Sequence, residues 1–241
     1  MRLAVSISAA AVMSLAMAIP AQAVTLIPNA DGSLTYLSIG DTSKIVFNGI
    51  SDQAVVPGLS ATLDLTLASI SATTFLFNYT LTNTSTAANA RVSGIGFDVD
   101  PNVASVSSTG VFDSGSLGGF TAGFSSETCF SGGTPQNCPQ GQNNSGVFLG
   151  TPGSGTLSLV YGAAPSLVTL SNFLDRYQGF NVGGVSSAVG QGTPGRGGGG
   201  LPPPAVPEPA TWLLMLVGFG AVGAATRRQR DTNLRVKFRL D

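Results

Sequence analysis

The sequence contains no histidine, and charged residues make up only 10 % of its 241 positions, against about 25 % in an ordinary soluble domain. Without histidine the chain has no Ser-His-Asp or Cys-His nucleophile system, no imidazole base and no histidine-ligated zinc. The 11 basic and 12 acidic residues nearly cancel, which excludes a nucleic-acid binder held by a basic surface. We therefore expect no cofactor, no nucleic-acid partner and no enzymatic activity.

The N-terminus has the order of segments of a secretory signal peptide. Arg2 supplies one positive charge, the apolar stretch 4–19 follows, and Ala21 and Ala23 are the small residues that signal peptidase requires. We predict a signal peptide over residues 1–23, cleaved after Ala23, with signal peptidase and the Sec export machinery as partners. An uncleaved N-terminal anchor is the alternative, although the apolar stretch is shorter than the roughly 20 residues of a membrane span.

Apolar and polar side chains alternate strictly in four segments of the middle of the chain. The side chains expected to face inward are Leu63, Leu65, Leu67, Phe75, Phe77, Tyr79, Leu81, Ile95, Phe97, Val99, Leu157, Leu159 and Tyr161. A period of two residues indicates strands with one buried face, and turn residues separate these strands. We predict an all-β domain over residues 24–182, an antiparallel β-sandwich or jelly roll.

A glycine- and proline-rich stretch follows over residues 183–205. It has almost nothing to bury, so its ordering would cost entropy with no compensating contact. We predict a flexible linker here, stiffened toward its end by the run Pro202-Pro203-Pro204.

An uncharged apolar segment extends from Ala210 to Thr226 and ends at an arginine cluster, Arg227, Arg228 and Arg230. At about 1.5 Å per residue it would span roughly 26 Å, close to the hydrocarbon thickness of about 30 Å. The arginines predict a stop-transfer signal on the cytoplasmic side. We therefore predict a transmembrane helix over residues 210–226, with a buried core helix as the alternative.

Residues 206–230 combine three features: Pro207-Glu208-Pro209 with Trp212 three positions later, the apolar segment, and the arginine cluster. This arrangement resembles the PEP-CTERM sorting signal, in its variant with tryptophan. The resemblance implies a Gram-negative exporter and processing near Pro-Glu-Pro by a membrane-embedded exosortase, a cysteine transpeptidase-like enzyme. It also implies transient residence in the inner membrane and a role beside exopolysaccharide in biofilm formation.

The two prolines hold the backbone extended outside the bilayer, where an enzyme can reach it, and we expect Glu208 to be a substrate determinant. In the alternative, Pro-Glu-Pro is only a linker before a permanent membrane anchor, and the chain would remain anchored with its domain facing the periplasm. A processed chain would instead reach the cell surface or the extracellular matrix. Residues 231–241 form an atypical basic tail, because such signals ordinarily end at the arginine cluster.

A second resemblance covers roughly residues 45–180. It is carried by the segments 73–86, 91–102 and 172–178 and by the hairpin between Cys129 and Cys138. These segments are similar to the cistern family of PEP-CTERM proteins, which has no established activity to transfer. The resemblance therefore bears on fold and export alone.

Cys129 and Cys138 enclose eight residues. In an exported chain two cysteines at this spacing are expected to form a disulfide, with free thiols as the alternative. The pair offers too few ligands for a metal site.

Asp98, Asp100 and Asn102 place oxygen-bearing side chains at alternate positions, as a calcium loop does. An EF-hand needs glycine at the sixth position and glutamate at the twelfth, where this chain has Val103 and Thr109. The simpler interpretation is a strand that ends in a turn; weak calcium binding is the alternative. We thus favour an exported, non-enzymatic surface or matrix protein, with a secreted, calcium-assisted carbohydrate-binding module as the second hypothesis.

Overall fold

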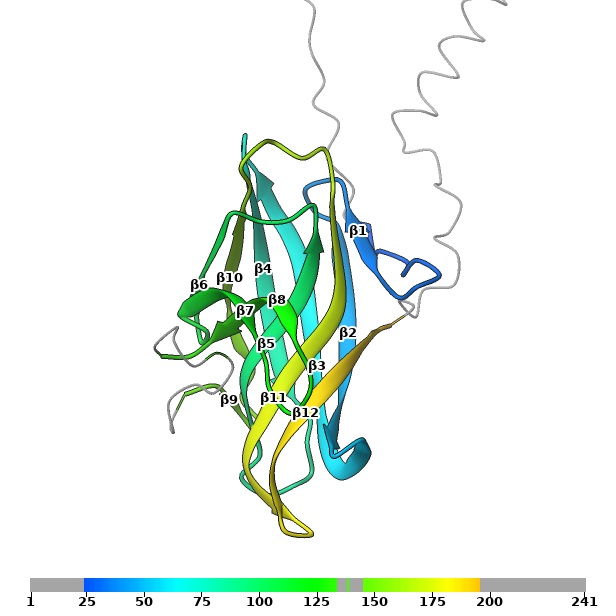
Figure 1. Cartoon of the computed structure of the whole chain (residues 1–241), viewed down its shortest axis with the longest axis vertical. Coiled ribbons are helices and arrows are strands. Elements are labelled where there is room, and N and C mark those ends of the chain that lie inside the picture. The colour runs from blue at the N-terminus through cyan, green and yellow to red at the C-terminus, as the bar shows by residue number, and fades with distance from the viewer. Residues whose placement is uncertain (1–23, 134–137, 139–144, 196–241) are drawn as a thin grey trace, which may run out of the picture. The chain divides into compact units, whose positions relative to one another are not determined.

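Antiparallel strands account for the regular structure of the residues described by this computed structural model, 24–133, 138 and 145–195 (Figure 1). The strands are β1 (Leu34–Tyr36), β2 (Thr42–Ser51), β3 (Ala54–Ile70), β4 (Thr74–Asn83), β5 (Arg91–Asp100), β6 (Ser105–Gly110), β7 (Ser114–Gly119), β8 (Ser126–Ser131), β9 (Val147–Phe148), β10 (Gly153–Val160), β11 (Val168–Val182) and β12 (Val185–Pro194). Within these ranges there is no helix of the length and apolarity that a membrane crossing requires. The helix predicted over residues 210–226 lies outside them.

All twelve strands belong to one sheet, in the order β6-β10-β4-β3-β2-β12-β11-β5-β8-β7, with β1 on β11 and β9 on β5. The prediction of an all-β antiparallel domain is confirmed. The predicted sandwich or jelly roll would consist of two facing sheets. The structure instead has one continuous sheet, which curls around the core. Its edge strands approach each other, since a Cβ added to Gly115 of β7 would lie 3.1 Å from Cα of Ser107 in β6.

The curvature has a local cause in the long strands. The pairing register shifts between Leu67 and Ser69 in β3, and between Ser171 and Leu174 in β11. Such bulges bend a strand and increase its twist, so a 17-residue and a 15-residue strand can follow a curled sheet. Asn172, within the second bulge, has a φ of 47°, a conformation that asparagine tolerates better than most residues.

The core lies inside this curl and consists of the side chains that the alternation predicts. All thirteen predicted inward residues are buried, and the most exposed of them, Tyr161, is 4 % exposed. Aromatic rings pack edge to face, as in Tyr36 against Phe77 at a centroid distance of 4.9 Å. Each buried phenylalanine or leucine contributes roughly 1.5–3 kcal/mol relative to an exposed one, so the core is the main source of stability.

The prediction of a linker that begins at residue 183 is wrong for residues 185–194. These residues form β12, which lies between β11 and β2 in the middle of the sheet. Ala188 and Val189 of this strand are buried, at 2 % and 0 % exposed. The remainder of the predicted linker, residues 196–205, lies outside the described residues.

The glycines of β12 serve close packing. A Cβ on Gly192 would lie 2.6 Å from Cγ2 of Ile45 and 2.7 Å from Cβ of Phe173, and a Cβ on Gly190 would collide with the carboxylate of Asp175. Glycine within a strand marks such close approach, whereas glycine in a linker provides flexibility. Composition alone does not distinguish the two, and this is why the boundary was misplaced.

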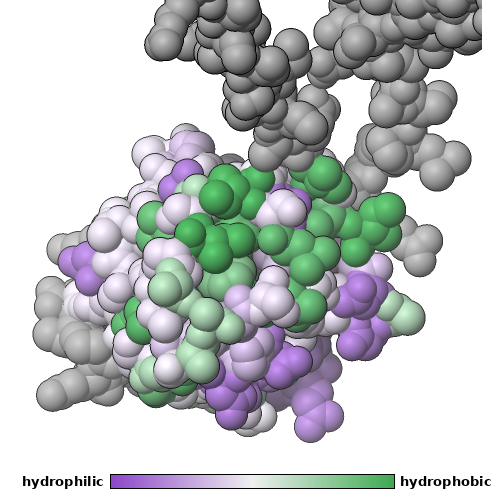
Figure 2. Space-filling model, turned by 90° about the horizontal axis from the view of Figure 1, so that it is seen from above, coloured by the Kyte–Doolittle hydropathy of each residue, from purple (hydrophilic) through white to green (hydrophobic). Residues whose placement is uncertain are grey.

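Both boundaries of the described domain lie beside the start of β2. The carbonyl oxygen of Val24 accepts a hydrogen bond from the amide of Thr42, and the amide of Gly195 donates one to the carbonyl of Lys44, each at 2.8 Å. We call the end of the sheet formed by the loops 37–41, 70–74, 101–104 and 161–167 the upper end, as drawn in Figure 1 and viewed directly in Figure 2. The opposite, lower end carries the turns at 51–54 and 182–185.

The packing of β12 predicts the effect of one added methyl group. Gly192→Ala should lower the free energy of unfolding by about 1–3 kcal/mol, because the methyl group overpacks Ile45 and Phe173. The matched control is Gly162→Ala, since a Cβ there meets nothing within 4 Å, and its effect should stay within about 0.5 kcal/mol. Urea denaturation of the two variants measures the difference, and equal stabilities would show that β12 is not packed in the sheet.

Candidate functional site

The residues of the predicted processing signals lie outside the described part of the chain. They are Ala21 and Ala23 of the signal-peptidase site, Pro207, Glu208, Pro209 and Trp212 of the sorting motif, and Arg227, Arg228 and Arg230 of the stop-transfer cluster. Their roles stay predictions from sequence. The described domain supplies the geometry of every other predicted site residue.

The structure brings three of the four segments of the second resemblance onto neighbouring strands. Strand β5, residues 91–100, pairs with β11 on one side and with β8 on the other. Arg91 lies opposite Gln178 of β11, and Gly96 lies opposite Cys129 of β8. Residues up to 87 positions apart in the chain thus lie on one continuous surface.

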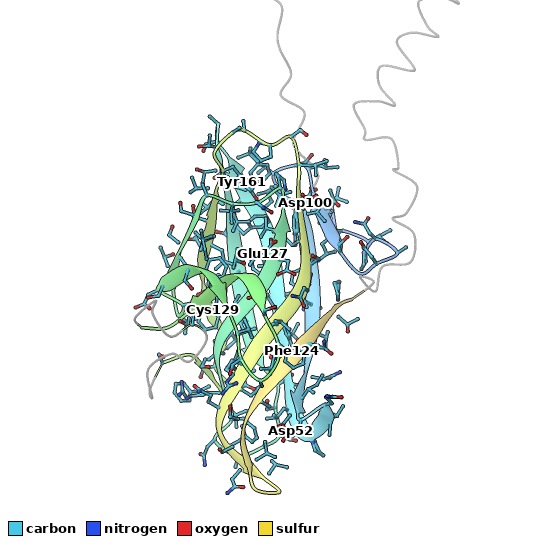
Figure 3. The ribbon with its side chains drawn as sticks, in the orientation of Figure 1. Asp52, Asp100, Phe124, Glu127, Cys129 and Tyr161 are labelled. Carbon is cyan, nitrogen blue, oxygen red and sulfur yellow. A yellow bond between two sulfur atoms is a disulfide. The ribbon has the colours of Figure 1, made fainter. Side chains whose placement is uncertain are left out.

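A bracket of polar side chains ties these three strands together on their solvent side. Asp98 accepts a hydrogen bond from the backbone amide of Glu127 at Oδ1 and one from Nδ2 of Asn172 at Oδ2, each at 2.9 Å. Glu127 Oε2 in turn accepts from the amide of Val99, and Asn172 Nδ2 also donates to the carbonyl of Ser125. We call Asp98, Glu127 and Asn172 the polar bracket; Glu127 is labelled in Figure 3.

The bracket decides how the weak calcium candidates should be understood. Both carboxylate oxygens of Asp98 already accept hydrogen bonds within the protein, so its charge is used for strand alignment. Asp100 and Asn102 are exposed at the upper end, where Figure 3 labels Asp100 near Tyr161. The strand ends at Asp100 and the chain bends at Pro101, and weak calcium binding by these residues stays a prediction.

Sequence reasoning missed Glu127 and Asn172 as partners of Asp98. Asn172 is 74 positions from Asp98, and its contact depends on the pairing of β5 with β11. Glu127 is the sole glutamate between residues 24 and 206, and this rarity was an available signal. The pairing register, however, cannot be read from either residue alone.

Cys129 and Cys138 form the predicted disulfide. Cys129 is completely buried in β8, and a Cβ on Gly119 of β7 would lie 2.6 Å from its Cβ. The bond therefore attaches the segment after β8 to a position where β7 and β8 are in close contact. Its role is structural, and no free cysteine accompanies it in the described residues.

Arg91 forms a second cross-strand contact. Its guanidinium donates to Oε1 of Gln178 at 3.1 Å and to the carbonyl oxygen of Ser145. Burial lowers the pKa of this guanidinium from its usual value, yet a guanidinium stays charged in proteins. The arginine thus connects β5 to β11 and to the segment that precedes β9.

Asp175 is the most unusual side chain of the described domain. It is completely buried, between Ile95 of β5 and Gly190 of β12 in the sheet register. Neither carboxylate oxygen makes a hydrogen bond of normal geometry within the described residues. Burial raises the pKa of Asp175 well above its ordinary value, and this outweighs the opposing influence of the Tyr177 hydroxyl and the Gly190 amide.

Comparison with known proteins identifies the C-terminal segment. Residues 205–230 match the family model of the PEP-CTERM protein-sorting motif. The chain therefore carries a sorting signal that targets an exported protein to exosortase, which processes it at the membrane on the way to the cell surface. No curated protein and no solved structure matches the chain.

The buried carboxyl group predicts how stability depends on pH. The pKa of Asp175 is higher in the folded state than in the unfolded state, where an aspartate has its ordinary pKa of about 3.9. The contribution of Asp175 to stability is therefore most favourable below about pH 4, and it is lost as pH rises toward the raised pKa. Asp175→Asn, which cannot ionise, should raise the midpoint of thermal unfolding at neutral pH, and the gain should shrink toward pH 4.

Asp52→Asn, which makes the same chemical change at an exposed turn of the lower end, is the matched control and should give no gain in the midpoint of thermal unfolding. Thermal unfolding followed by circular dichroism across this pH range tests the pair. A gain for Asp175→Asn that is the same at every pH would contradict ionisation of Asp175 as its cause.

Removal of the disulfide should destabilise the domain by a predictable amount. Cys129 and Cys138 are nine positions apart, and closing a loop of that length restricts the unfolded chain by about 2–3 kcal/mol. The double variant Cys129→Ala, Cys138→Ala should lose that much in chemical denaturation. A reducing agent should lower the stability of the unaltered protein by the same amount and should not change the stability of the double variant. If the reducing agent does not change the stability of the unaltered protein, the prediction is wrong.

Proposed function

We propose that this chain is an exported, non-enzymatic protein of the cell surface or extracellular matrix, released by exosortase and acting beside exopolysaccharide. The observation that carries the proposal is the sorting motif at residues 205–230. The disulfide between Cys129 and Cys138 supports it, because such bonds form and persist in oxidising compartments outside the cytoplasm.

The carboxylates of the domain support a structural role. Asp98 aligns three strands, Asp41 accepts hydrogen bonds from the amides of Leu37 and Ser38, and Asp113 accepts one from the amide of Gly133. A general acid or base must instead reach a substrate proton. Acidic groups that hold backbone amides in place favour a scaffold over a hydrolase.

The exopolysaccharide contact rests on the polar outer face of the sheet. Hydroxyl groups pair across neighbouring strands there, as between Thr109 of β6 and Thr156 of β10 at 2.8 Å. Such uncharged hydroxyl rows match the donors and acceptors of a sugar polymer. Membership of the cistern group is part of the same proposal, since three of the four segments that suggest it lie on β5 and on its neighbours β8 and β11.

Processing depends on Glu208 in this proposal. In a host with exosortase, the chain should lose its C-terminal segment in a pulse-chase experiment that follows an epitope inserted between Gly183 and Gly184. Glu208→Gln should slow that loss at least about tenfold, if the charge supplies one charge-assisted hydrogen bond of roughly 1.5–3 kcal/mol to the enzyme. The measurement is the ratio of the longer to the shorter species over time.

Glu127→Gln is the control for that experiment, because it makes the same chemical change in the other glutamate of the chain. A glutamine oxygen can still accept from the amide of Val99, so the domain should remain folded and be processed normally. Mature protein that retains the peptide beyond Trp212 in an exosortase-positive host would reject the proposal.

A further inference from the structure

Exposed apolar side chains gather at the upper end of the domain. Five of the ten exposed large hydrophobic residues in the described ranges belong to its loops or to the segment that enters beside them, and they are Val24, Ile27, Leu37, Ile39 and Ile70. We call these five residues the apolar end. Figure 2, which views the domain from above, shows hydrophobic residues across this end.

Contacts place the two loops of the apolar end side by side. The amide of Gly40 donates to the carbonyl of Leu67, and the amide of Leu67 donates to the carbonyl of Asp41. The loop that carries Leu37 and Ile39 therefore lies along the end of β3, the strand that ends at Ile70. Leu37 is 56 % exposed and Ile39 is 47 % exposed. Contiguous apolar surface of this kind marks an interaction site in soluble domains.

Charge is almost absent from this end. Asp41 is the one charged residue in the four upper loops, and it is 4 % exposed with its Oδ2 held by two backbone amides. Two exposed carboxylates border this end, Asp100 at the rim and Asp31 in the segment that carries Ile27. The described domain as a whole has nine acidic and three basic side chains, so negatively charged lipid headgroups repel it through its net negative charge.

The chain also leaves the domain close to this end. Gly195 is bonded to Lys44, two residues from the contact of Val24 with Thr42. The match to the sorting motif begins at residue 205, and ten residues can span at most roughly 35 Å. A domain attached to the membrane through that motif is thus kept within that distance of the motif, and the chain leaves the domain at the start of β2, directly after the loop 37–41.

We propose that the apolar end rests on the phospholipid surface while the chain is still attached, and that it leaves the surface after exosortase processing. This inference rests on the membrane stage of the proposed function. Leu37, Ile39 and Ile70 insert among the headgroups and upper acyl chains, and the attachment supplies the high local concentration that such a small patch needs. Loss of the attachment removes that concentration, which makes the contact reversible.

The test uses the full chain in vesicles of phosphatidylethanolamine and phosphatidylglycerol. An environment-sensitive fluorophore is attached through Ile39→Cys, or through Val55→Cys as the matched control, an apolar residue 67 % exposed near the lower end. We expect a blue shift and a loss of intensity with spin-labelled lipids for the label at position 39, and neither change at position 55. Adding Leu37→Asp and Ile70→Asp to Ile39→Cys should abolish both effects.

Each other outcome overturns the inference in a recognisable way. Equal signals at positions 39 and 55 in chains that resist carbonate extraction would show an attached domain with no lipid contact. Energy transfer between donor- and acceptor-labelled chains at position 39, lost on dilution, would show that a second copy covers the apolar end. Release of the chain by carbonate would overturn both this inference and the membrane stage of the proposed function.

Discussion

The insertion of β12 between β2 and β11 is the interaction on which the rest of this structure depends. Without it the path β6-β10-β4-β3-β2 would be separated from the path β11-β5-β8-β7. The strand fits because Gly190 and Gly192 leave space for Asp175, Ile45 and Phe173. Since β12 ends at Pro194 and the sorting motif begins at residue 205, the sheet cannot be completed until the chain has been synthesised almost as far as the motif.

The polar groups of the domain serve this curled sheet in two different ways. The polar bracket connects β5 to its neighbours on the solvent side, and Arg91, which is 6 % exposed, connects it from a buried position. A hydrogen bond to a charged group of this kind contributes roughly 1.5–3 kcal/mol. Asp175 lies inside, without a hydrogen bond of normal geometry in the described residues, and it opposes stability whenever it is ionised. Its position opposite Gly190 shows that the sheet accommodates this carboxyl group by omitting a side chain on the adjacent strand.

The apolar end connects the surface chemistry of the domain with the membrane-attached stage of export. A domain with nine acidic side chains among its described residues would ordinarily be held away from an anionic membrane. The loops 37–41 and 161–167 expose almost no charge, and both domain boundaries lie beside them. The same end can therefore tolerate lipid before processing and water afterwards, which suits a protein that passes through a membrane-attached stage.

Local physical chemistry was enough for the strands, because a two-residue period places Leu63, Phe75 or Ile95 inside regardless of which strands are neighbours. It was also enough for the bond between Cys129 and Cys138, which are close in the chain, and for the tripartite signal at residues 206–230. The number of sheets, the β12 pairing and the contact of Asp98 with Asn172 were decided by the tertiary structure, since each depends on strand register between distant segments. Glycine illustrates the difference. In the sequence a glycine-rich stretch indicates a flexible backbone, whereas in the folded sheet Gly192 is packed so closely that a side chain would not fit.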